Sequence, residues 1–292
     1  HLTDADLVIL VGCRTPWYPP MQCPTQGKIV AIGDHPHKEW LIYQDMHADS
    51  YLEGDIAATL VALVKNLSNA GLKREVNQSR RAKWAGEHAK TMGLLEEERA
   101  TGVADDTLNP ATICAAIAEA MPADTIFVDE TITHFPALRK HLPLTLPQTL
   151  FRHTVGGLGQ GLGLSLGLKL AAPERPVGLF IGDGSLLYNP ITQAFGASRE
   201  YNLPIMIVVM NNGGYKAMRG GHVKYYPDGM VNATELTYGI EIHGPEYEEL
   251  GNQFGINGVS ADTYNGFREA LGTAAKDIAD GSASIINAVL PD

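Results

Sequence analysis

Short apolar runs alternate with amphipathic stretches along most of the chain. Residues 6–12 (DLVILVG) and 28–33 (KIVAIG) are continuous apolar runs of strand length, as is typical of strands buried in a parallel sheet. Residues 55–66 carry apolar side chains at helical spacing, and a Gly-Asp pair at their start is a cap signal. Two strands and one helix cannot cover both faces of a sheet. Residues 1–70 are therefore predicted to be the end of a domain whose beginning lies elsewhere.

The middle of the chain loses this pattern. Residues 72–106 are charged, poor in β-branched side chains and without a clear apolar stripe, which predicts a linker with some helix. We place this linker at residues 71–108. A second domain then covers residues 109–292, because Asn109-Pro110 suits the cap and first turn of a helix.

From residue 109 onward, predicted strands and helices alternate. The strands are expected at 125–129, 177–181, 205–210 and 284–290, and the helices at 111–120, 161–170, 191–201 and 264–278. This alternation indicates an α/β fold with a doubly wound parallel sheet. In such sheets, ligands bind beyond the carboxyl ends of the strands.

Polar residues follow two of these strands directly. Gly182-Asp183-Gly184-Ser185 comes after the strand at 177–181, and Asn211-Asn212 comes after the strand at 205–210. Asp183, Asn212 and a carbonyl of the Gly213-Gly214 turn are the oxygen ligands that Mg²⁺ prefers, and the glycines leave room for phosphate groups. Gly-Asp-Gly alone would be an ordinary capped turn. Together with the two asparagines it predicts a magnesium and phosphate site.

A dinucleotide site, as in an NAD-dependent dehydrogenase, is the main alternative at this edge of the sheet. Residues 157–161 (GLGQG) would then be the phosphate loop, and Asp183, 24 residues after Gly159, would bind the ribose. Such a loop should follow a buried strand, and residues 151–154 (FRHT) make a poor one. Asn211-Asn212 would also have no role. The metal site is therefore favoured.

Composition narrows the range of partners. The net charge of −11 argues against nucleic acid or an anionic membrane surface, so amides and a metal ion would have to hold a phosphate group. No apolar run reaches the roughly 18 residues that span a bilayer. Cys13, Cys23 and Cys114 form no CxxC pattern and are typical of free thiols in a reducing compartment. A cytoplasmic location is expected, although a chain that starts at His1 leaves a lost targeting segment open.

Gly-Asp-Gly-Ser followed by Asn-Asn at this spacing resembles the cofactor-binding signature of thiamine diphosphate enzymes. The resemblance extends through GGLGQGLGLSLGLKLAAPERPVGLFIGDGS and YNLPIMIVVMNNGGYKAMRGG, and is greatest to benzoylformate decarboxylases and then to acetolactate synthase large subunits. It covers nearly the whole chain and is strongest over residues 127–219. It implies the thiamine diphosphate-binding fold for residues 109–292, and the end of a Rossmann-like central domain for residues 1–70.

The resemblance implies which residues bind thiamine diphosphate and its Mg²⁺. The expected cofactor-binding residues are Glu130, Thr131, Gly156, Leu158, Gly182, Asp183, Gly184, Ser185, Asn212, Gly214 and Tyr215. Among them, Asp183, Asn212 and the carbonyl of Gly214 would hold the metal.

Three residues are expected to take part in the chemistry. Leu158 matches the bulky residue that keeps the cofactor bent in this family, and the carbonyl of Gly156 would accept a hydrogen bond from the cofactor's amino group. His134, just after Glu130-Thr131, could act as an acid or base because histidine titrates near neutral pH. A structural histidine is the commoner case.

The implied activity is the decarboxylation of a small 2-oxo acid, carboligation, or both, through an enamine intermediate. An acetolactate synthase-type transferase is the alternative. In this family, a glutamate on a pyrimidine-binding N-terminal domain activates the cofactor across a subunit interface, and nothing in this sequence resembles that domain. We therefore expect the C-terminal half of a dimeric or tetrameric enzyme, with the other half on a second polypeptide or a cleaved fragment. A non-catalytic cofactor-binding or regulatory chain is the alternative from another class, and the intact Asp183, Asn212 and Leu158 argue against it.

Two segments are candidates for substrate contacts. Residues 14–20 (RTPWYPP) follow a predicted strand, and Trp17 and Tyr18 could form an apolar wall for a bulky acyl group or simply pack a rigid loop. Residues 220–244 depart from the relatives and could be a mobile cover or a surface insertion.

Overall fold

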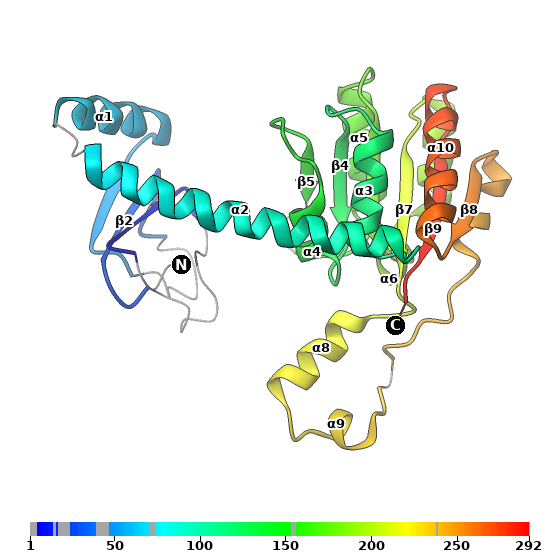
Figure 1. Cartoon of the computed structure of the whole chain (residues 1–292). Coiled ribbons are helices and arrows are strands. Elements are labelled where there is room, and N and C mark those ends of the chain that lie inside the picture. Colours follow the sequence, from blue (N-terminus) through cyan, green and yellow to red (C-terminus); the bar gives the residue numbers. More distant parts are fainter. Residues whose placement is uncertain are drawn as a thin grey trace. The chain divides into compact units, whose positions relative to one another are not determined.

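The computed structural model describes residues 5–13, 16, 24–38, 47–70, 74–152, 156–237 and 239–291. The chain divides into two compact units, His1–Glu87 (unit 1) and His88–Asp292 (unit 2), each with its own sheet (Figure 1). The division falls inside α2 (Arg74–Ala104), a continuous helix of 31 residues that occupies most of the expected linker. The assignment of residues 1–70, 71–108 and 109–292 to a central domain, a linker and a cofactor domain stays a prediction.

Unit 1 contains a parallel sheet in the order β1 (Leu7–Val11), β2 (Lys28–Gly33), β3 (Ser50–Glu53). α1 (Ile56–Asn69) follows, and Asp55 caps it by accepting a hydrogen bond from the Ala58 amide at 2.7 Å.

β1 differs from the expectation of a strand buried on both faces. Val8 and Leu10 are buried, whereas Leu7, Ile9 and Val11 are 40–49% exposed. One face of β1 is therefore open to solvent.

Unit 2 contains a parallel sheet of six strands in the order β5-β4-β6-β7-β9-β8. The strands are β4 (Ile126–Glu130), β5 (Leu150–Arg152), β6 (Val177–Gly182), β7 (Met206–Asn211), β8 (Asn257–Ala261) and β9 (Ser284–Val289). The helices that follow α2 are α3 (Pro110–Ala120), α4 (Phe135–His141), α5 (Gly161–Ala171), α6 (Asp183–Leu186), α7 (Ile191–Glu200), α8 (Lys216–Tyr225), α9 (Met230–Thr234), η3 (Tyr247–Phe254) and α10 (Tyr264–Ala279). The predicted α/β fold with a doubly wound parallel sheet is confirmed.

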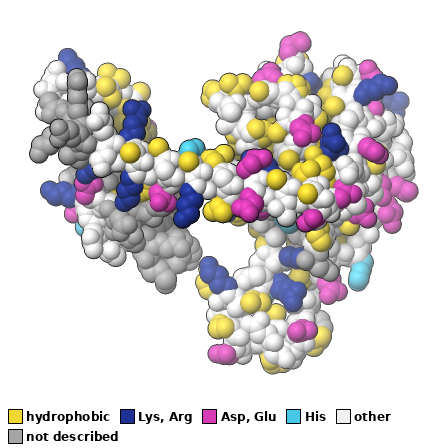
Figure 2. Space-filling view, in the orientation of Figure 1, with side chains coloured by type: hydrophobic (Ala, Val, Ile, Leu, Met, Phe, Trp, Pro, Cys, Tyr) yellow, Lys and Arg dark blue, Asp and Glu magenta, His cyan; other side chains and the backbone are white. Residues whose placement is uncertain are grey.

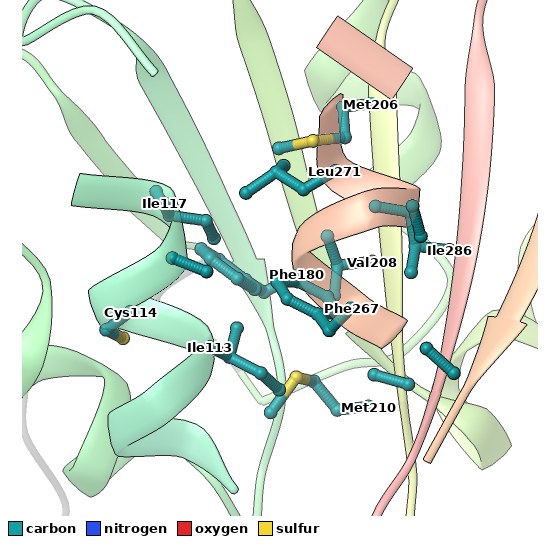
Figure 3. Close-up of a cluster of buried hydrophobic side chains, with 14 of the residues drawn as sticks. Ile113, Cys114, Ile117, Phe180, Met206, Val208, Met210, Phe267, Leu271 and Ile286 are labelled. Carbon is teal, nitrogen blue, oxygen red and sulfur yellow. The ribbon is translucent and has the colours of Figure 1, made fainter. Parts of the chain in front are cut away.

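Helices cover both faces of this sheet, which explains the continuous apolar runs of its strands. On one face, Ile113 and Ile117 of α3 and Phe267 and Leu271 of α10 pack around Phe180 of β6 (Figure 3). On the other face, residues of α5 and α7 belong to a second buried cluster with β6 residues that alternate with Phe180. Strands buried on both sides hold the sheet rigid, and its carboxyl edge is therefore a fixed platform for a site.

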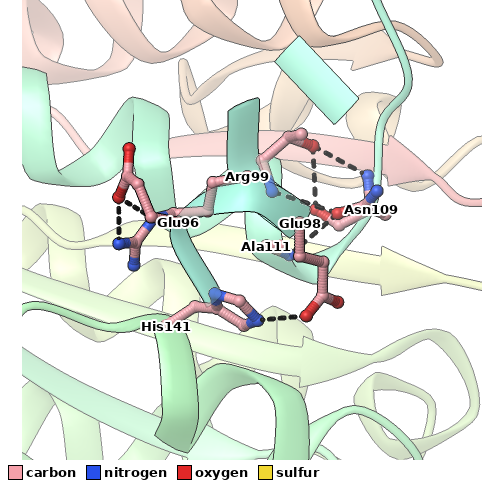
Figure 4. A network of polar contacts seen from close by, with 7 residues as sticks. Glu96, Glu98, Arg99, Asn109, Ala111 and His141 are labelled. Carbon is pink, nitrogen blue, oxygen red and sulfur yellow. Dashed lines mark hydrogen bonds and ion pairs between the residues drawn. The ribbon is translucent and has the colours of Figure 1, made fainter. Parts of the chain in front are cut away.

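α3 begins one residue before the expected helix at 111–120, and Asn109 caps it as predicted, within a complete capping box. The Asn109 side chain accepts hydrogen bonds from the amides of Ala111 (2.9 Å) and Thr112 (3.1 Å), and the Asn109 amide donates to Thr112 Oγ1 (3.0 Å; Figure 4). Nearby, His141 Nε2 at the end of α4 lies 3.2 Å from Glu98 Oε2 of α2 (Figure 4). The contact between Glu98 and His141 thereby joins α2 to α4 within unit 2.

The surface of unit 2 reflects the composition. Acidic side chains are spread over the face shown in Figure 2, in keeping with the net charge of −11. Among the described residues, no helix is long and apolar enough to cross a membrane.

Candidate functional site

A pocket of about 240 Å³ lies at the carboxyl ends of β4, β6 and β7, which are neighbours in the sheet. Every predicted site residue except Glu130 lines it. The lining residues are Thr131, Ile132, Thr133, His134, Gly156, Leu158, Gly182, Asp183, Gly184, Ser185, Met210, Asn212, Gly214, Tyr215, Ala217 and Met218. Segments up to 87 positions apart are brought together because parallel strands end at the same edge of the sheet.

Asp183 is the first residue after β6 and only 3% exposed. Its Oδ1 accepts a hydrogen bond from the Gly184 amide at 2.8 Å, whereas Oδ2 is buried and has no hydrogen-bond partner. Burial raises the pKa of this carboxyl, and the nearby amides of Gly184, Gly214 and Gly213 offset part of the rise. A buried carboxylate oxygen without a donor is costly unless a cation binds it. The geometry therefore fits a metal ion at Oδ2.

Asn212 lies opposite Asp183, just after β7. Its Oδ1 accepts a hydrogen bond from the Gly214 amide at 3.3 Å, and its Nδ2 lies 3.0 Å from His134 Nε2. Burial and the charge of Lys216 lower the pKa of His134, so the neutral ring accepts at Nε2 and keeps its proton on Nδ1. The Gly214 carbonyl accepts one hydrogen bond, from the Lys216 amide at 2.9 Å, and retains a second lone pair.

The turn after β7 is held by the end of the segment at 220–244, a contact that the sequence did not predict. The Tyr215 amide donates to the Ile240 carbonyl at 2.8 Å, and the Ile242 amide donates to the Gly213 carbonyl at 3.1 Å. A Cβ on Gly214 would lie 2.3 Å from the Ile240 oxygen, so only glycine permits this approach. Residues 220–244, expected to be a mobile cover or a surface insertion, contain the end of α8 and all of α9, and neither helix has a buried residue. Residues 240–242, which follow these helices, pair with the site turn.

Aromatic side chains surround the Gly182–Ser185 turn. A Cβ on Gly184 would lie 2.4 Å from the Tyr215 ring, so the ring rests directly on this glycine. Tyr247, which the sequence analysis also missed, is buried, its hydroxyl has no hydrogen-bond partner, and burial raises its pKa to about 12. Nothing in the local sequence around Tyr247 signals a site, because it reaches this region only through the fold.

Glu130 differs from the expectation that it lines the cofactor pocket. It is fully buried, and Oε1 accepts hydrogen bonds from the amides of Gly159 (2.5 Å) and Gln160 (3.2 Å). Its Oε2 accepts from the Gly161 amide (2.6 Å) and from Asn189 Nδ2 (3.1 Å). The carboxylate therefore supports the turn that carries Leu158 from behind.

The same contacts argue against the dinucleotide alternative. A phosphate loop needs free amides at the start of its helix. The amides of Gly159, Gln160 and Gly161 already donate to the Glu130 carboxylate. A dinucleotide phosphate would find neither donors nor a favourable charge at this turn.

The two aromatic candidates for substrate contacts, Trp17 and Tyr18 in the stretch at 14–20, lie outside the described residues.

Comparison with known proteins gives a consistent result. Residues 132–288 match the family model "Thiamine pyrophosphate enzyme, C-terminal TPP binding domain". The chain is 30% identical to the benzoylformate decarboxylase of Pseudomonas aeruginosa, over 75% of this chain and 37% of that protein. It is 24% identical to the acetolactate synthase large subunit of Parasynechococcus marenigrum, over 88% of this chain and 39% of that one.

A solved structure shares the fold. The thiamine diphosphate-dependent 4-hydroxybenzoylformate decarboxylase of Rhodococcus jostii RHA1 matches with a TM-score of 0.70 at 21% identity, over 99% of this chain and 49% of that one. The chain thus spans about half, or less, of the length of the relatives it matches.

Proposed function

The chain belongs to the thiamine pyrophosphate enzymes, and from this premise we propose that it holds thiamine diphosphate (thiamine pyrophosphate) and Mg²⁺ in an enzyme that decarboxylates a 2-oxo acid. The observation that carries the proposal is Asp183 Oδ2, an oxygen buried without a partner beside Asn212 at the ends of two adjacent strands.

The residues of the pocket divide into two proposed groups. Asp183, Asn212 and the carbonyl of Gly214 would hold Mg²⁺, which takes oxygen ligands in octahedral geometry and shares them with phosphates. Gly184, with Gly182, Ser185 and Tyr215, would face the diphosphate, since all of them line the pocket and the Tyr215 ring rests on Gly184. When bound, the cofactor supplies the electron sink that a decarboxylation needs.

The turn that carries Gly156 and Leu158 would set the position of the cofactor rings. Leu158 is the bulky apolar residue there, and Gly156 (φ +69°) gives the turn a conformation that other residues rarely adopt. Thr131 lines the same pocket from the turn that follows β4. His134 would offer its Nδ1–H to the bound ligand as a hydrogen-bond donor in this proposal, because Nε2 already accepts from the Asn212 amide. Met210 and Met218 add apolar surface that limits water in the pocket.

The same site fits an enzyme that catalyses decarboxylation and one that catalyses carboligation. The benzoylformate decarboxylase supports the first outcome, and the acetolactate synthase large subunit supports a transferase. We favour the decarboxylase because that relative is the more similar of the two.

We further propose that residues outside this chain complete the enzyme, as a second polypeptide or another fragment, in a dimer or tetramer of the complete unit in the cytoplasm. The relatives are about twice as long. In unit 1, Leu7, Ile9 and Val11 expose apolar surface on a parallel sheet, and such sheets are normally covered on both faces.

Denaturing mass spectrometry, followed by assays on the intact sample, tests these proposals. A second polypeptide should be found, and the assembly should release CO₂ from 2-oxo acids such as benzoylformate or pyruvate only with Mg²⁺ and thiamine diphosphate. An aldehyde product indicates a decarboxylase and a longer hydroxyketone a carboligase. Turnover by this chain alone would refute the need for a partner. Cofactor binding without turnover in the complete assembly would favour a non-catalytic role, and stabilisation by NAD instead would refute the proposed function.

A further inference from the structure

Two buried carboxylates stand side by side where β4 ends, and neither lines the pocket. Asp129 is 1% and Glu130 0% exposed. Because successive side chains of a strand point to opposite faces, the two carboxylates face opposite sides of the sheet. Each of them contacts a different turn of the pocket wall.

Glu130 and Asn189 together satisfy the backbone donors at the start of α5. A helix leaves its first four amides without an intrahelical partner, and negative charge is favourable there. Glu130 accepts from the amides of Gly159, Gln160 and Gly161, and Asn189 Oδ1 accepts from the Leu162 amide at 3.1 Å. All four consecutive amides at 159–162 therefore have side-chain acceptors.

Asn189 also joins this arrangement to the metal end of the pocket. Its Nδ2 donates to Glu130 Oε2 at 3.1 Å and to the Ser185 carbonyl at 3.0 Å. One buried amide thereby links the turn before α5 to the Gly182–Ser185 turn after β6.

The glycines of the turn permit the close approach. A Cβ on Gly161 would lie 2.4 Å from Glu130 Oε2, and one on Gly159 (φ +96°) would lie 2.7 Å from the Tyr188 carbonyl oxygen. Four of the six residues at 156–161 are glycines, so this turn has an unusually large conformational entropy when nothing holds it. Leu158 lies in the middle of it.

Asp129 supports a different turn of the pocket, the one that follows β4. Its Oδ1 accepts hydrogen bonds from the Thr131 amide (2.9 Å) and the Thr131 hydroxyl (2.6 Å). Its Oδ2 lies 3.4 Å from Arg152 Nε, and the Arg152 guanidinium stacks 3.7 Å above the Phe135 ring. These contacts hold the turn that carries Thr131 and His134.

We propose that Glu130 is a positioning residue of the cofactor site. Its carboxylate, with Asn189, fixes the glycine-rich turn that presents Gly156 and Leu158 to the cofactor rings, while Asp129 independently fixes the turn that follows β4. This inference rests on the proposed function. It predicts that loss of the Glu130 contacts disturbs the ring end of the site and spares the metal end.

Hydrogen exchange of the cofactor-free protein tests the structural half of this proposal. Glu130→Gln keeps the side-chain shape but removes the charge and replaces one acceptor oxygen with an NH₂ group, which then faces donors in either orientation of the amide. The amides at 159–162 should exchange at least about tenfold faster, with β6, β7 and the Thr131–His134 turn unchanged. The matched control is Glu174→Gln, at an exposed position just after α5. Unchanged exchange at 159–162 would overturn the proposal.

If Glu130→Gln fails to fold, Asn189→Ala provides the second variant. It removes the acceptor of the Leu162 amide and leaves the three backbone contacts of Glu130 in place. Exchange should then rise at Leu162 and less at the three preceding amides. Equal protection in wild type and variant would again overturn the proposal.

Ligand affinity tests the functional half. In the complete assembly, Glu130→Gln should weaken thiamine diphosphate at least about tenfold, whereas inorganic pyrophosphate with Mg²⁺, which lacks the rings, should bind within about twofold of wild type. Equal weakening of both ligands would show a general structural effect and refute the positioning role. If the wild type binds neither ligand, the proposed function fails, while the exchange experiment still decides whether Glu130 holds the turn.

Discussion

Replacing Asp183 with Asn separates the metal site from the stability of the fold. The substitution keeps the size of the side chain and removes its charge. In the cofactor-free protein, Oδ2 is buried without a partner, and burial raises the pKa of the carboxyl. The charged form therefore destabilises the folded state, and Asp183→Asn should be as stable as the wild type or more stable.

The sign of the pH dependence follows from the same shift. Because the pKa of Asp183 is higher in the folded than in the unfolded state, the folded protein binds this proton more tightly. The carboxyl then lowers stability above its folded pKa and has no such effect below its unfolded pKa. Any advantage of Asp183→Asn at neutral pH should disappear as the pH falls through this window.

With ligands, the order of stability reverses. Ligand at a hundredfold excess over its Kd stabilises the native state by about 2.7 kcal/mol. For a domain of the size of unit 2, about 2–4 °C of Tm corresponds to each kcal/mol, so the wild type should gain about 5–11 °C. Asp183→Asn should gain almost nothing, because it offers Mg²⁺ no charged oxygen.

Differential scanning fluorimetry measures both effects in one series. Wild type, Asp183→Asn and the exposed control Asp262→Asn are melted alone, with Mg²⁺ plus thiamine diphosphate or pyrophosphate, and with a chelator added. Asp262→Asn should follow the wild type throughout. A full Mg²⁺-dependent shift in Asp183→Asn would refute the metal assignment. A loss of several degrees without ligand would refute the account of a destabilising buried charge.

Two further pairs of substitutions test the packing, one beside the site and one in the core. Gly161→Ala places a Cβ 2.4 Å from Glu130 Oε2 and should cost about 1–3 kcal/mol in urea unfolding, whereas Gly167→Ala on the same helix meets nothing within 4 Å and should stabilise by about 0.5–1 kcal/mol. Equal effects of the two would contradict the close contact. Phe267→Ala, at a fully buried position, should cost about 3–5 kcal/mol, and exposed Leu170→Ala about 0.5 kcal/mol or less. A small loss at Phe267 would mean that the core between α3 and α10 is looser than described.

The local pattern of the sequence predicted most of unit 2. Its long strands are buried on both faces, so their apolar runs are continuous and easy to recognise. Asn109 was predicted as the cap of α3 because a cap involves neighbours in sequence, and the structure adds Thr112 as the second half of a capping box. β5 and β8 were missed because β5 has three residues and β8 is mostly exposed, so neither carries an apolar run.

The site residues were predicted in part for a related reason. Asp183 and Asn212 directly follow strands, and the ends of adjacent parallel strands must meet. Glu130 likewise lies at the end of a strand, but its side chain does not line the pocket. Its side chain faces the start of α5, and this orientation depends on which helix covers that side of β4.

The sequence alone therefore determined the α/β fold of unit 2, and it predicted the edge of the sheet and the oxygen ligands that we propose for the metal site. These features follow from periodicity and from residues next to each other in the chain. The tertiary structure alone decided that Glu130 supports a wall, that Ile240 closes the Gly213–Tyr215 turn, and that the Tyr247 hydroxyl is buried without a partner. Such contacts join residues far apart in the chain, and no local pattern encodes the packing that brings them together.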